Sequence, residues 1–389
     1  MKIALLSETS RGYGREFLNG IARFAQEQCD WSLHLLTPNG LKTTRPFAGF
    51  DGIIARVSDA DTIHKLKTSG LPVVDASHQT PLPGFISVGS DDIAIARLAA
   101  MFFLARGFHS FAFCGYHGAA FSDTRSSAFR NVIADAGFEV MEYTKPEPMT
   151  DAFIFDEKLD QNIPGASLRR WVKSLPSSTA VFCANDMRAY QVVKIASETG
   201  IRVPQDISVL GTDNDTFLCH FSPTPLSSID PNAHNVGYAA ARLLLASIKN
   251  PPRNKKRPIL RIHPGKLIER TSTEFHPISP EWLSDALTFI DRNRFHPLSV
   301  AKVVALCHHS AHTVTKTFLK HFGLTPGRYI MNLKMEEARR LIAHRKHSCK
   351  EIAVLLGFSS PQYFCNAYKA HYGHSPFAKI TRSKKEHRQ

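Results

Sequence analysis

The chain has 389 residues, of which 43% are hydrophobic and 21% charged, and this composition is typical of a folded protein of two or three domains rather than a disordered one. No apolar run approaches the roughly 18–20 residues that cross a bilayer, which excludes a membrane-spanning helix. The net charge is +14, and the seven cysteines, with no CxxC pair, fit neither a disulfide framework nor a zinc site, so we expect a cytoplasmic protein without metal or cofactor.

Short apolar runs alternate with helix-length amphipathic segments along residues 1–230. The first run is too short for a signal peptide and is predicted to be a strand. The predicted strands are Ile3–Ser7, Trp31–Leu36, Gly52–Arg56, Val73–Ala76, Phe111–Gly115, Val140–Tyr143, Ala180–Ala184 and Ile207–Gly211. The predicted helices are Arg15–Glu27, Ala60–Ser69, Ile93–Arg106, Arg125–Ala136, Leu168–Ser174 and Arg188–Thr199. This order predicts parallel sheets with helices on both faces, in two lobes that separate near Gly107–Ser110.

After the next predicted helix, Asn232–Ile248, the chain leads to a region that lacks strand patterns and is strongly basic. The weakly patterned stretch Thr271–Pro280 is predicted to link two domains, and no strand pattern follows it. From Pro280 to Gln389 the chain carries 18 Lys and Arg against 7 Asp and Glu, a net charge of +11. This excess overlies an apolar-patterned region and favours a polyanionic partner, with a merely solvated basic surface as the alternative.

The basic region repeats itself at an offset of 50 residues. Ser310, Val314, Phe318, His321, Phe322, Gly323 and Pro326 recur as Ser360, Phe364, Tyr368, His371, Tyr372, Gly373 and Pro376. In each copy the apolar positions fall on one face of a helix that ends at glycine. A shorter helix is predicted upstream in each copy, Val300–Cys307 after Ser299 and Lys350–Leu356 after Ser348, with the serines as N-caps.

A short helix, a tight turn and a second helix, present twice, predict an all-α double helix-turn-helix domain. Such a unit places its second helix in the major groove, and two copies fit successive grooves about 34 Å apart. A helical bundle without a ligand is the alternative. The basic charge and the polar residues that open each second helix favour the DNA-binding interpretation.

Residues 280–382 resemble the AraC family of bacterial transcription regulators. The resemblance is carried by Leu298-Ser299, residues 310–318, Gly323-Leu324-Thr325-Pro326, residues 334–341 (KMEEARRL), Glu351-Ile352-Ala353, residues 357–360 (GFSS), Tyr363-Phe364 and residues 373–376 (GHSP). Carried over by resemblance, the base-reading positions are Ala311, His312, Thr315, Lys316, Pro361, Gln362, Cys365 and Asn366. Two positions depart from the family pattern: His308 stands where glycine is usual, and Lys379 where an aromatic residue is usual.

The chemistry of these positions suits DNA. Lys316 can reach guanine O6 and N7, and Gln362 or Asn366 can pair with adenine. The remaining polar positions are expected to contact phosphates; they are Ser310, Ser360 and Lys369. His308, His309 and His312 could chelate a metal by their spacing, although a polar surface is the better interpretation.

Residues 1–273 resemble the LacI-type sugar-sensing domain, which is related to periplasmic sugar-binding proteins. The resemblance is carried by Tyr13-Gly14-Arg15, Gly89-Ser90-Asp91-Asp92, Ala184-Asn185-Asp186, residues 203–211 (VPQDISVLG), Asp213-Asn214-Asp215 and Leu226-Ser227-Ser228-Ile229. A LacI-type sensor followed by an AraC-type DNA-binding domain resembles the xylose operon regulators. The expected architecture is a two-lobed α/β domain over 1–273, a linker over 274–282 and the double helix-turn-helix over 283–382.

In parallel sheets, ligands bind at the carboxyl ends of the strands, which in this fold meet between the lobes. The expected sugar-binding residues are Tyr13, Asp91, Phe121, Arg125, Asn185, Asp186 and Asp213, with Arg125 and Asp213 foremost by resemblance. Alternatives stay open: Asp91 and Asp186 as helix N-caps, residues 213–215 as a simple turn, and Phe121 as an ordinary loop aromatic.

The resemblance therefore implies a sugar-responsive transcription regulator, expected to activate D-xylose or related pentose catabolic genes. The expected partners are double-stranded DNA, a pentose effector, a second copy of the chain and RNA polymerase. An enzyme or a transport protein on the same fold is the second hypothesis. No catalytic residues are expected, because the sequence contains no HExxH or comparable motif.

Overall fold

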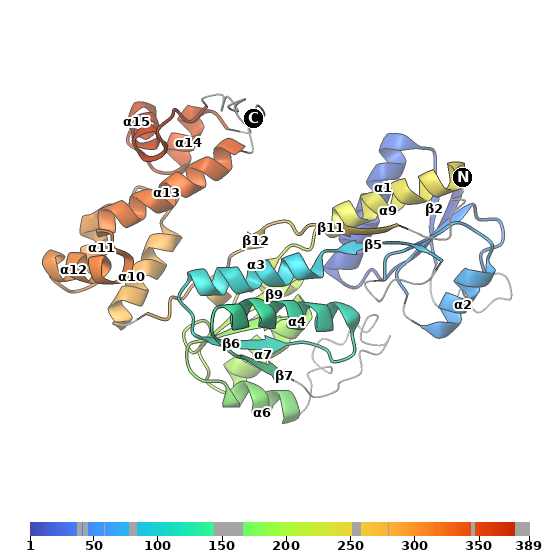
Figure 1. Cartoon of the computed structure of the whole chain (residues 1–389), viewed down its shortest axis with the longest axis horizontal. Coiled ribbons are helices and arrows are strands. Elements are labelled where there is room, and N and C mark those ends of the chain that lie inside the picture. The colour runs from blue at the N-terminus through green and yellow to red at the C-terminus, as the bar shows by residue number, and fades with distance from the viewer. Residues whose placement is uncertain are drawn as a thin grey trace, which may run out of the picture. The chain divides into compact units, whose positions relative to one another are not determined.

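The N-terminal part of the chain is built on two six-stranded sheets (Figure 1). The computed structural model describes residues 1–36, 41, 46–57, 59–77, 84–143, 166–250, 258–278, 280–343 and 347–377. Lys379 and the end of the expected DNA-binding domain thus lie outside the described residues. Contacts divide the chain into two units, Met1–Glu274 and Phe275–Gln389.

The first sheet is entirely parallel, with the strand order β11-β5-β4-β3-β1-β2. Its strands are β1 Lys2–Leu6, β2 Ser32–Leu35, β3 Gly52–Ala55, β4 Val73–Asp75, β5 Ile86–Ser90 and β11 Ile259–Ile262. The central strands β3, β4 and β5 are buried along their whole length. Helices cover both faces of such a sheet, which explains why β3 (GIIA) and most of β4 (VVD) are apolar.

The second sheet repeats this design, with the order β12-β10-β9-β8-β6-β7. Its strands are β6 Ser110–Cys114, β7 Val140–Tyr143, β8 Thr179–Cys183, β9 Ile207–Thr212, β10 Ser227–Ile229 and β12 Leu267–Ile268. Of the described strands only β12 runs antiparallel to its neighbour, β10. The two-lobed architecture with parallel sheets is confirmed.

Helices surround both sheets. They are α1 Gly12–Gln28, α2 Ala60–Thr68, α3 Asp92–Ala105, α4 Ala120–Asp135, α6 Ala166–Ser174, α7 Asp186–Glu198, α8 Thr216–Phe221, α9 Ala233–Lys249 and the 3-10 helix η2 Thr271–Thr273. The chain passes between the sheets after β5, after β10 and after β11. Among the described helices none combines the length and the apolarity needed to span a bilayer.

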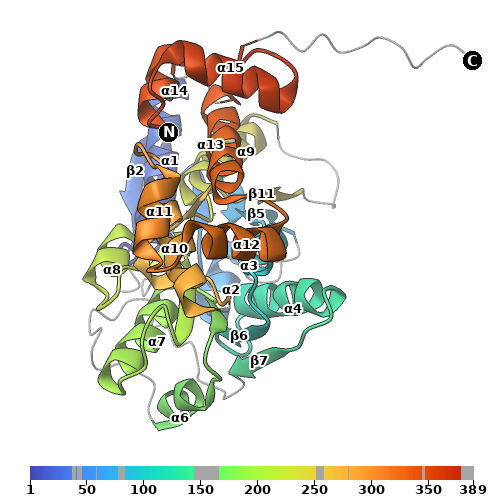
Figure 2. The same cartoon turned by 90° about the vertical axis from the view of Figure 1, so that its left-hand side faces the viewer.

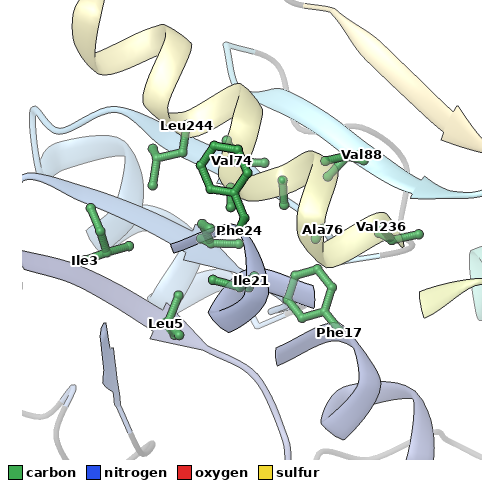
Figure 3. Close-up of a cluster of buried hydrophobic side chains, with 14 of the residues drawn as sticks. Ile3, Leu5, Phe17, Ile21, Phe24, Val74, Ala76, Val88, Val236 and Leu244 are labelled. Carbon is green, nitrogen blue, oxygen red and sulfur yellow. The ribbon is translucent and has the colours of Figure 1, made fainter. Parts of the chain in front are cut away.

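Helices α1 and α9 pack side by side on the first sheet, over a core that Figure 3 shows in close-up. Phe17 and Ile21 of α1 and Val236 and Leu244 of α9 belong to this core. The helix backbones touch at glycine: a Cβ on Gly237 would lie 1.9 Å from the Phe17 carbonyl oxygen. No side chain fits there, so the close approach depends on glycine.

Among its described residues the second unit contains helices and loops but no strand. Its helices are α10 Glu281–Arg292, α11 Val300–Leu306, α12 Ala311–Phe322, α13 Pro326–Ala343, α14 Cys349–Leu355 and α15 Pro361–Tyr372. Figures 1 and 2 both show α13 running between the helix group α10–α12 and the pair α14–α15.

Two separate hydrophobic cores hold this unit together, and α13 contributes to both. Ile330 packs in the first core with Val314 and Phe318 of α12. Met335 belongs to the second core with Phe364 of α15. Each core therefore belongs to one helix-turn-helix, and α13 connects the two.

Candidate ligand site and DNA-binding surface

Asp213 follows the last residue of β9 and adopts a backbone conformation that side chains rarely take, with φ at 120°. Such strain costs about 1–3 kcal/mol and is concentrated at functional sites. Its carboxylate is half-buried and, among the described residues, accepts no hydrogen bond. Loss of hydration and the neighbouring Asp186 carboxylate raise its pKa well above the usual value, while Arg125 and Arg56 oppose this shift. Asp213 thus offers an acceptor with no hydrogen bond from the described residues, within electrostatic reach of the Arg125 and Arg56 guanidinium groups.

Arg125 lies buried in α4 and faces the same region. Its Nε and Nη2 donate to Oδ1 of Asp92 at 2.9 and 2.7 Å, and its Nη1 donates to the carbonyl oxygen of Ala184. The guanidinium lies 5.2 Å from the ring centroid of Phe121, which is in the first turn of α4 rather than in a loop. Burial raises the pKa of Asp92 despite this ion pair.

Tyr13 joins this cluster from α1, on the other sheet. Its hydroxyl lies 3.3 Å from Ser90 Oγ, and its ring lies 4.3 Å from the guanidinium carbon of Arg56. Burial raises the pKa of the Tyr13 hydroxyl, with smaller contributions in the same direction from the carboxylates of Asp92 and Asp213. Side chains from both sheets therefore meet here, as the strand-end argument predicts.

The remaining predicted residues play parts in the local framework. Asp91 is the N-cap of α3, where Oδ1 accepts the N–H of Ala94 at 3.0 Å. Asn185, and not Asp186, is the N-cap of α7, and its Oδ1 also accepts the Tyr116 hydroxyl at 3.2 Å. The N-cap interpretation is thus right for Asp91 and wrong for Asp186.

Asp186 lies fully buried beneath the strand ends. Its oxygens accept the Ser228 hydroxyl at 2.6 Å and the backbone N–H of Asp215 at 2.8 Å. Loss of hydration raises its pKa to about 6, and the hydrogen bonds only partly offset this effect. Asp186 therefore holds the turn at residues 213–215 in place through its hydrogen bond to the backbone of Asp215.

Sequence reasoning missed several members of the cluster. Arg56 follows β3 and donates to both oxygens of Glu8 at 3.0 Å, and Arg188 stacks its guanidinium 4.2 Å from the Tyr116 ring. Glu8 and Arg56 could have been found as polar residues at strand ends. Asp92 could have been found too, because it stands next to Asp91 in the segment that carries the resemblance and begins α3.

The second unit presents two helices with the same pattern of exposure. Each residue from 311 to 320 in α12 is buried, half-buried or exposed in the same way as the residue 50 positions later in α15. The exposed residues among the predicted base readers are Ala311, His312, Lys316, Pro361, Gln362 and Asn366, whereas Thr315 and Cys365 are half-buried. Lys369 is also exposed. Offset by 50 residues, Lys316 and Asn366 occupy equivalent places with different chemistry.

The helix ends are organised as the sequence predicts. Ser299 and Ser348 are N-caps of α11 and α14, and Gly323 and Gly373 end α12 and α15 in the left-handed conformation. Ser310 and Ser360 cap α12 and α15 by accepting the N–H groups of Thr313 and Tyr363, both at 3.1 Å. These serines therefore already have a structural role at the start of each exposed helix.

The tight turns of the two copies differ. His308 takes the left-handed conformation with φ at 51°, and Gly357 has the same role with φ at 65°. A Cβ on Gly357 would lie 2.5 Å from backbone atoms of His296 and Pro297, so only glycine fits. The His309 ring packs 5.0 Å from the Trp282 ring, and the described residues contain no cluster of His, Cys, Asp or Glu that could hold a metal.

Comparisons with protein families match both units. Residues 100–273 match the periplasmic binding protein-like domain, and residues 304–379 match a helix-turn-helix domain. The xylose operon regulatory proteins of Haemophilus influenzae and Escherichia coli K12 are each 26% identical to this chain over 391 aligned residues. The alignments cover 96% of this chain and 97% and 95% of those proteins, respectively.

Solved structures give the same picture. The structure of the xylose-binding transcription activator xylR is 25% identical, with a TM-score of 0.59, and covers 96% of both chains. A periplasmic binding protein/LacI transcriptional regulator from Alkaliphilus metalliredigens, complexed with D-xylulofuranose, covers 70% of this chain and 98% of its own, with 19% identity and a TM-score of 0.57. The second match supports the fold of the N-terminal unit alone.

Proposed function

We propose that this chain, a DNA-binding transcription regulator with a periplasmic-binding-protein-like sugar-sensing domain and no enzymatic role, activates pentose catabolic genes when it binds D-xylose or a related pentose. The names of its relatives support a pentose, since two are xylose operon regulators and one solved neighbour is described as xylose-binding. Residues 1–273 would form the sensor and residues 283–382 the DNA-binding domain, joined by a linker over 274–282.

The sugar would bind where the strand ends of the two sheets meet. The observation that carries this proposal is Asp213: a strained residue whose carboxylate accepts no hydrogen bond among the described residues, within electrostatic reach of Arg125. A carboxylate and a guanidinium side by side are suited to vicinal sugar hydroxyls. Tyr13 and Phe121 would cover the apolar face of the ring.

The other predicted sugar ligands would contribute less. Asp91, Asn185 and Asp186 already accept hydrogen bonds from backbone N–H groups, which uses part of their capacity. They would complete the ring of acceptors around the sugar or hold the primary residues in place. A sugar that contacts both lobes would favour their closed arrangement, and the changed arrangement would alter DNA binding.

DNA would be read by the exposed first turns of α12 and α15. Lys316 would contact guanine, and Gln362 or Asn366 adenine. Lys369 would contact phosphate, and Ser310 and Ser360 would do so alongside their capping role. Ala311, His312, Thr315, Pro361 and Cys365 would line the same surface. The protein would act in the cytoplasm as a homodimer that contacts RNA polymerase.

A sugar panel tests the proposal directly. Thermal unfolding would be followed with D-xylose, L-arabinose, D-ribose and D-glucose, using the wild type and Asp213→Asn. A pentose at 100 times its Kd stabilises by about 2.7 kcal/mol, which raises Tm by roughly 5–10 °C for a sensor of this size. Asp213→Asn should abolish that shift. If no sugar alters either Tm or promoter affinity, the sensor assignment is wrong.

A further inference from the structure

Two cysteine thiols face each other inside the second helix-turn-helix. Cys349 is the first residue of α14, and Cys365 lies in the second turn of α15. Their Sγ atoms are 2.8 Å apart, and both residues are half-buried. A disulfide bond is about 2.05 Å long, so the sulfurs need to approach by only about 0.8 Å to bond.

The repeat shows that this pair is not required by the helix-turn-helix architecture. In the first copy Val300 opens α11 and Thr315 occupies the place of Cys365 in α12. The first copy therefore folds with an aliphatic and a hydroxyl side chain at the same places. Only the second copy has acquired two thiols in contact.

The pair also differs from another thiol pair in the chain. Cys114 and Cys183 are opposite each other on β6 and β8, but both are completely buried in the second sheet. A dissolved oxidant cannot reach them without unfolding. Cys349 and Cys365, half-exposed on a small helical unit, are accessible by comparison.

We propose that Cys349 and Cys365 form a reversible disulfide that ties the recognition helix α15 to α14 under oxidising conditions. The oxidant is a low-molecular-weight disulfide such as oxidised glutathione. One protein thiolate attacks it, forms a mixed disulfide and releases one thiol. The second protein thiolate then attacks the mixed disulfide and releases the other thiol. Two protein thiols are oxidised and one external disulfide is reduced to two thiols, with two protons transferred.

The same contact supports the second attack. Burial raises the pKa of the Cys349 thiol. Whichever cysteine forms the mixed disulfide, the 2.8 Å contact holds the other sulfur beside it, so the second attack takes place within the pair.

The test uses the reduced full-length chain incubated with oxidised glutathione. Peptide mapping by mass spectrometry should detect a peptide pair linked through Cys349 and Cys365, which dithiothreitol separates. The disulfide restricts the unfolded chain between the two cysteines and so makes unfolding less favourable. Tm of the helical unit should therefore rise by at least about 5 °C.

The first copy of the repeat supplies the control variants. Cys349→Val and Cys365→Thr reproduce its residues, so both should fold, and neither should give the linked peptide or the rise in Tm. The proposal is overturned if wild type yields no Cys349–Cys365 linkage after exposure to oxidised glutathione. It is equally overturned if the linkage forms and Tm stays unchanged. Neither result depends on the sugar or on DNA, so the outcome is separate from that of the proposed function.

Discussion

Oδ2 of Asp215 accepts the backbone N–H of Gly12 at 2.6 Å, while Oδ1 of the same carboxylate accepts the N–H of Phe217 at 3.1 Å. One side chain thus caps two helices, α1 on the first sheet and α8 on the second. Arg15 lies 3.4 Å from this carboxylate, but it is too exposed for the ion pair to add much. The lobes are therefore joined by a hydrogen bond that breaks if they move apart.

Asp215→Asn separates the two capping roles. The amide oxygen can still cap α8, but the amide NH₂ group cannot accept from Gly12. Because the lost bond supports the arrangement that brings Tyr13, Asp213 and Arg125 together, the sugar concentration at half-saturation should rise about tenfold. Titration calorimetry would measure it. Asp59→Asn is the control, since Asp59 caps α2 within one lobe and should leave sugar affinity unchanged.

Gly237→Ala tests the contact between α1 and α9. The added Cβ would lie 1.9 Å from the Phe17 carbonyl oxygen, so the helices must separate, at a cost of about 1–3 kcal/mol or more. Denaturant unfolding would measure the loss. Gly327→Ala in α13 is the matched control, because its Cβ would lie 3.4 Å from Val300 and meets no clash. The control should stabilise its helix by up to about 1 kcal/mol, and equal losses in both variants would contradict this account.

Arg125→Lys should raise the sugar concentration at half-saturation more than tenfold while sugar-free DNA affinity stays near that of wild type. Lysine keeps the charge beside Asp92 but loses the fork that suits vicinal hydroxyls. Arg125→Ala should in addition lower stability by about 3–5 kcal/mol, because Asp92 is left buried without its partner. Arg130→Ala on the same helix removes an ion pair between Glu142 and an exposed arginine. It should change neither the sugar concentration at half-saturation nor the stability. Loss of sugar-free DNA binding in Arg125→Lys would make Arg125 a structural residue instead.

The buried Asp186 makes the sensor less stable as the pH rises. Its folded-state pKa of about 6 lies above the unfolded value of 3.8, so the native state binds the extra proton between these values. The stabilisation is complete below pH 3.8 and is lost as the pH rises through 6, at up to about 1.4 kcal/mol per pH unit. Tm of the sensor measured from pH 5 to 7.5 should therefore fall more steeply in wild type than in Asp186→Asn. Parallel profiles would argue against this assignment.

Lys316→Ala should weaken operator binding by about 1–3 kcal/mol and relax the preference for one base pair, if Lys316 contacts a base. Asn366→Ala, at the equivalent place in the second copy, should relax the preference at a different base pair. Electrophoretic mobility shifts on a set of single-substitution operators would show both effects. A uniform loss on every operator would assign Lys316 to phosphate instead.

The sequence predicts the strands that are mostly apolar, such as β1 (KIALL) and β8 (TAVFC), because parallel strands covered on both faces bury mainly hydrophobic side chains. It does not predict β5 (ISVGS) or β10 (SSI), which are buried although serine and glycine carry no apolar pattern. These strands are specified by their neighbours in the sheet. Likewise α8, of six residues, is too short to show helical periodicity.

The site residues also divide into those that a local sequence pattern predicts and those that only the tertiary structure brings into place. The resemblance and the strand-end argument bring Tyr13, Arg125 and Asp213 into one region, and the structure places them there. No local pattern predicts that Asp215 caps a helix 203 residues earlier in the chain, because that contact depends on how the two sheets face each other. The thiol pair at Cys349 and Cys365 was missed because the two cysteines are 16 residues apart in the sequence and meet only when α14 packs on α15.

Helix α13 fixes how the two helix-turn-helix copies are rotated relative to each other, because it packs in the core of both. Ile330 in the first core and Met335 in the second are five residues apart on one continuous helix. Each residue turns an α-helix by about 100° and advances it by 1.5 Å. Inserting a single residue between them would swing α15 by roughly that angle around the axis of α13 relative to α12. Under the proposed function, the spacing between the base pairs that α12 and α15 contact is therefore set by the number of residues in α13 between Ile330 and Met335.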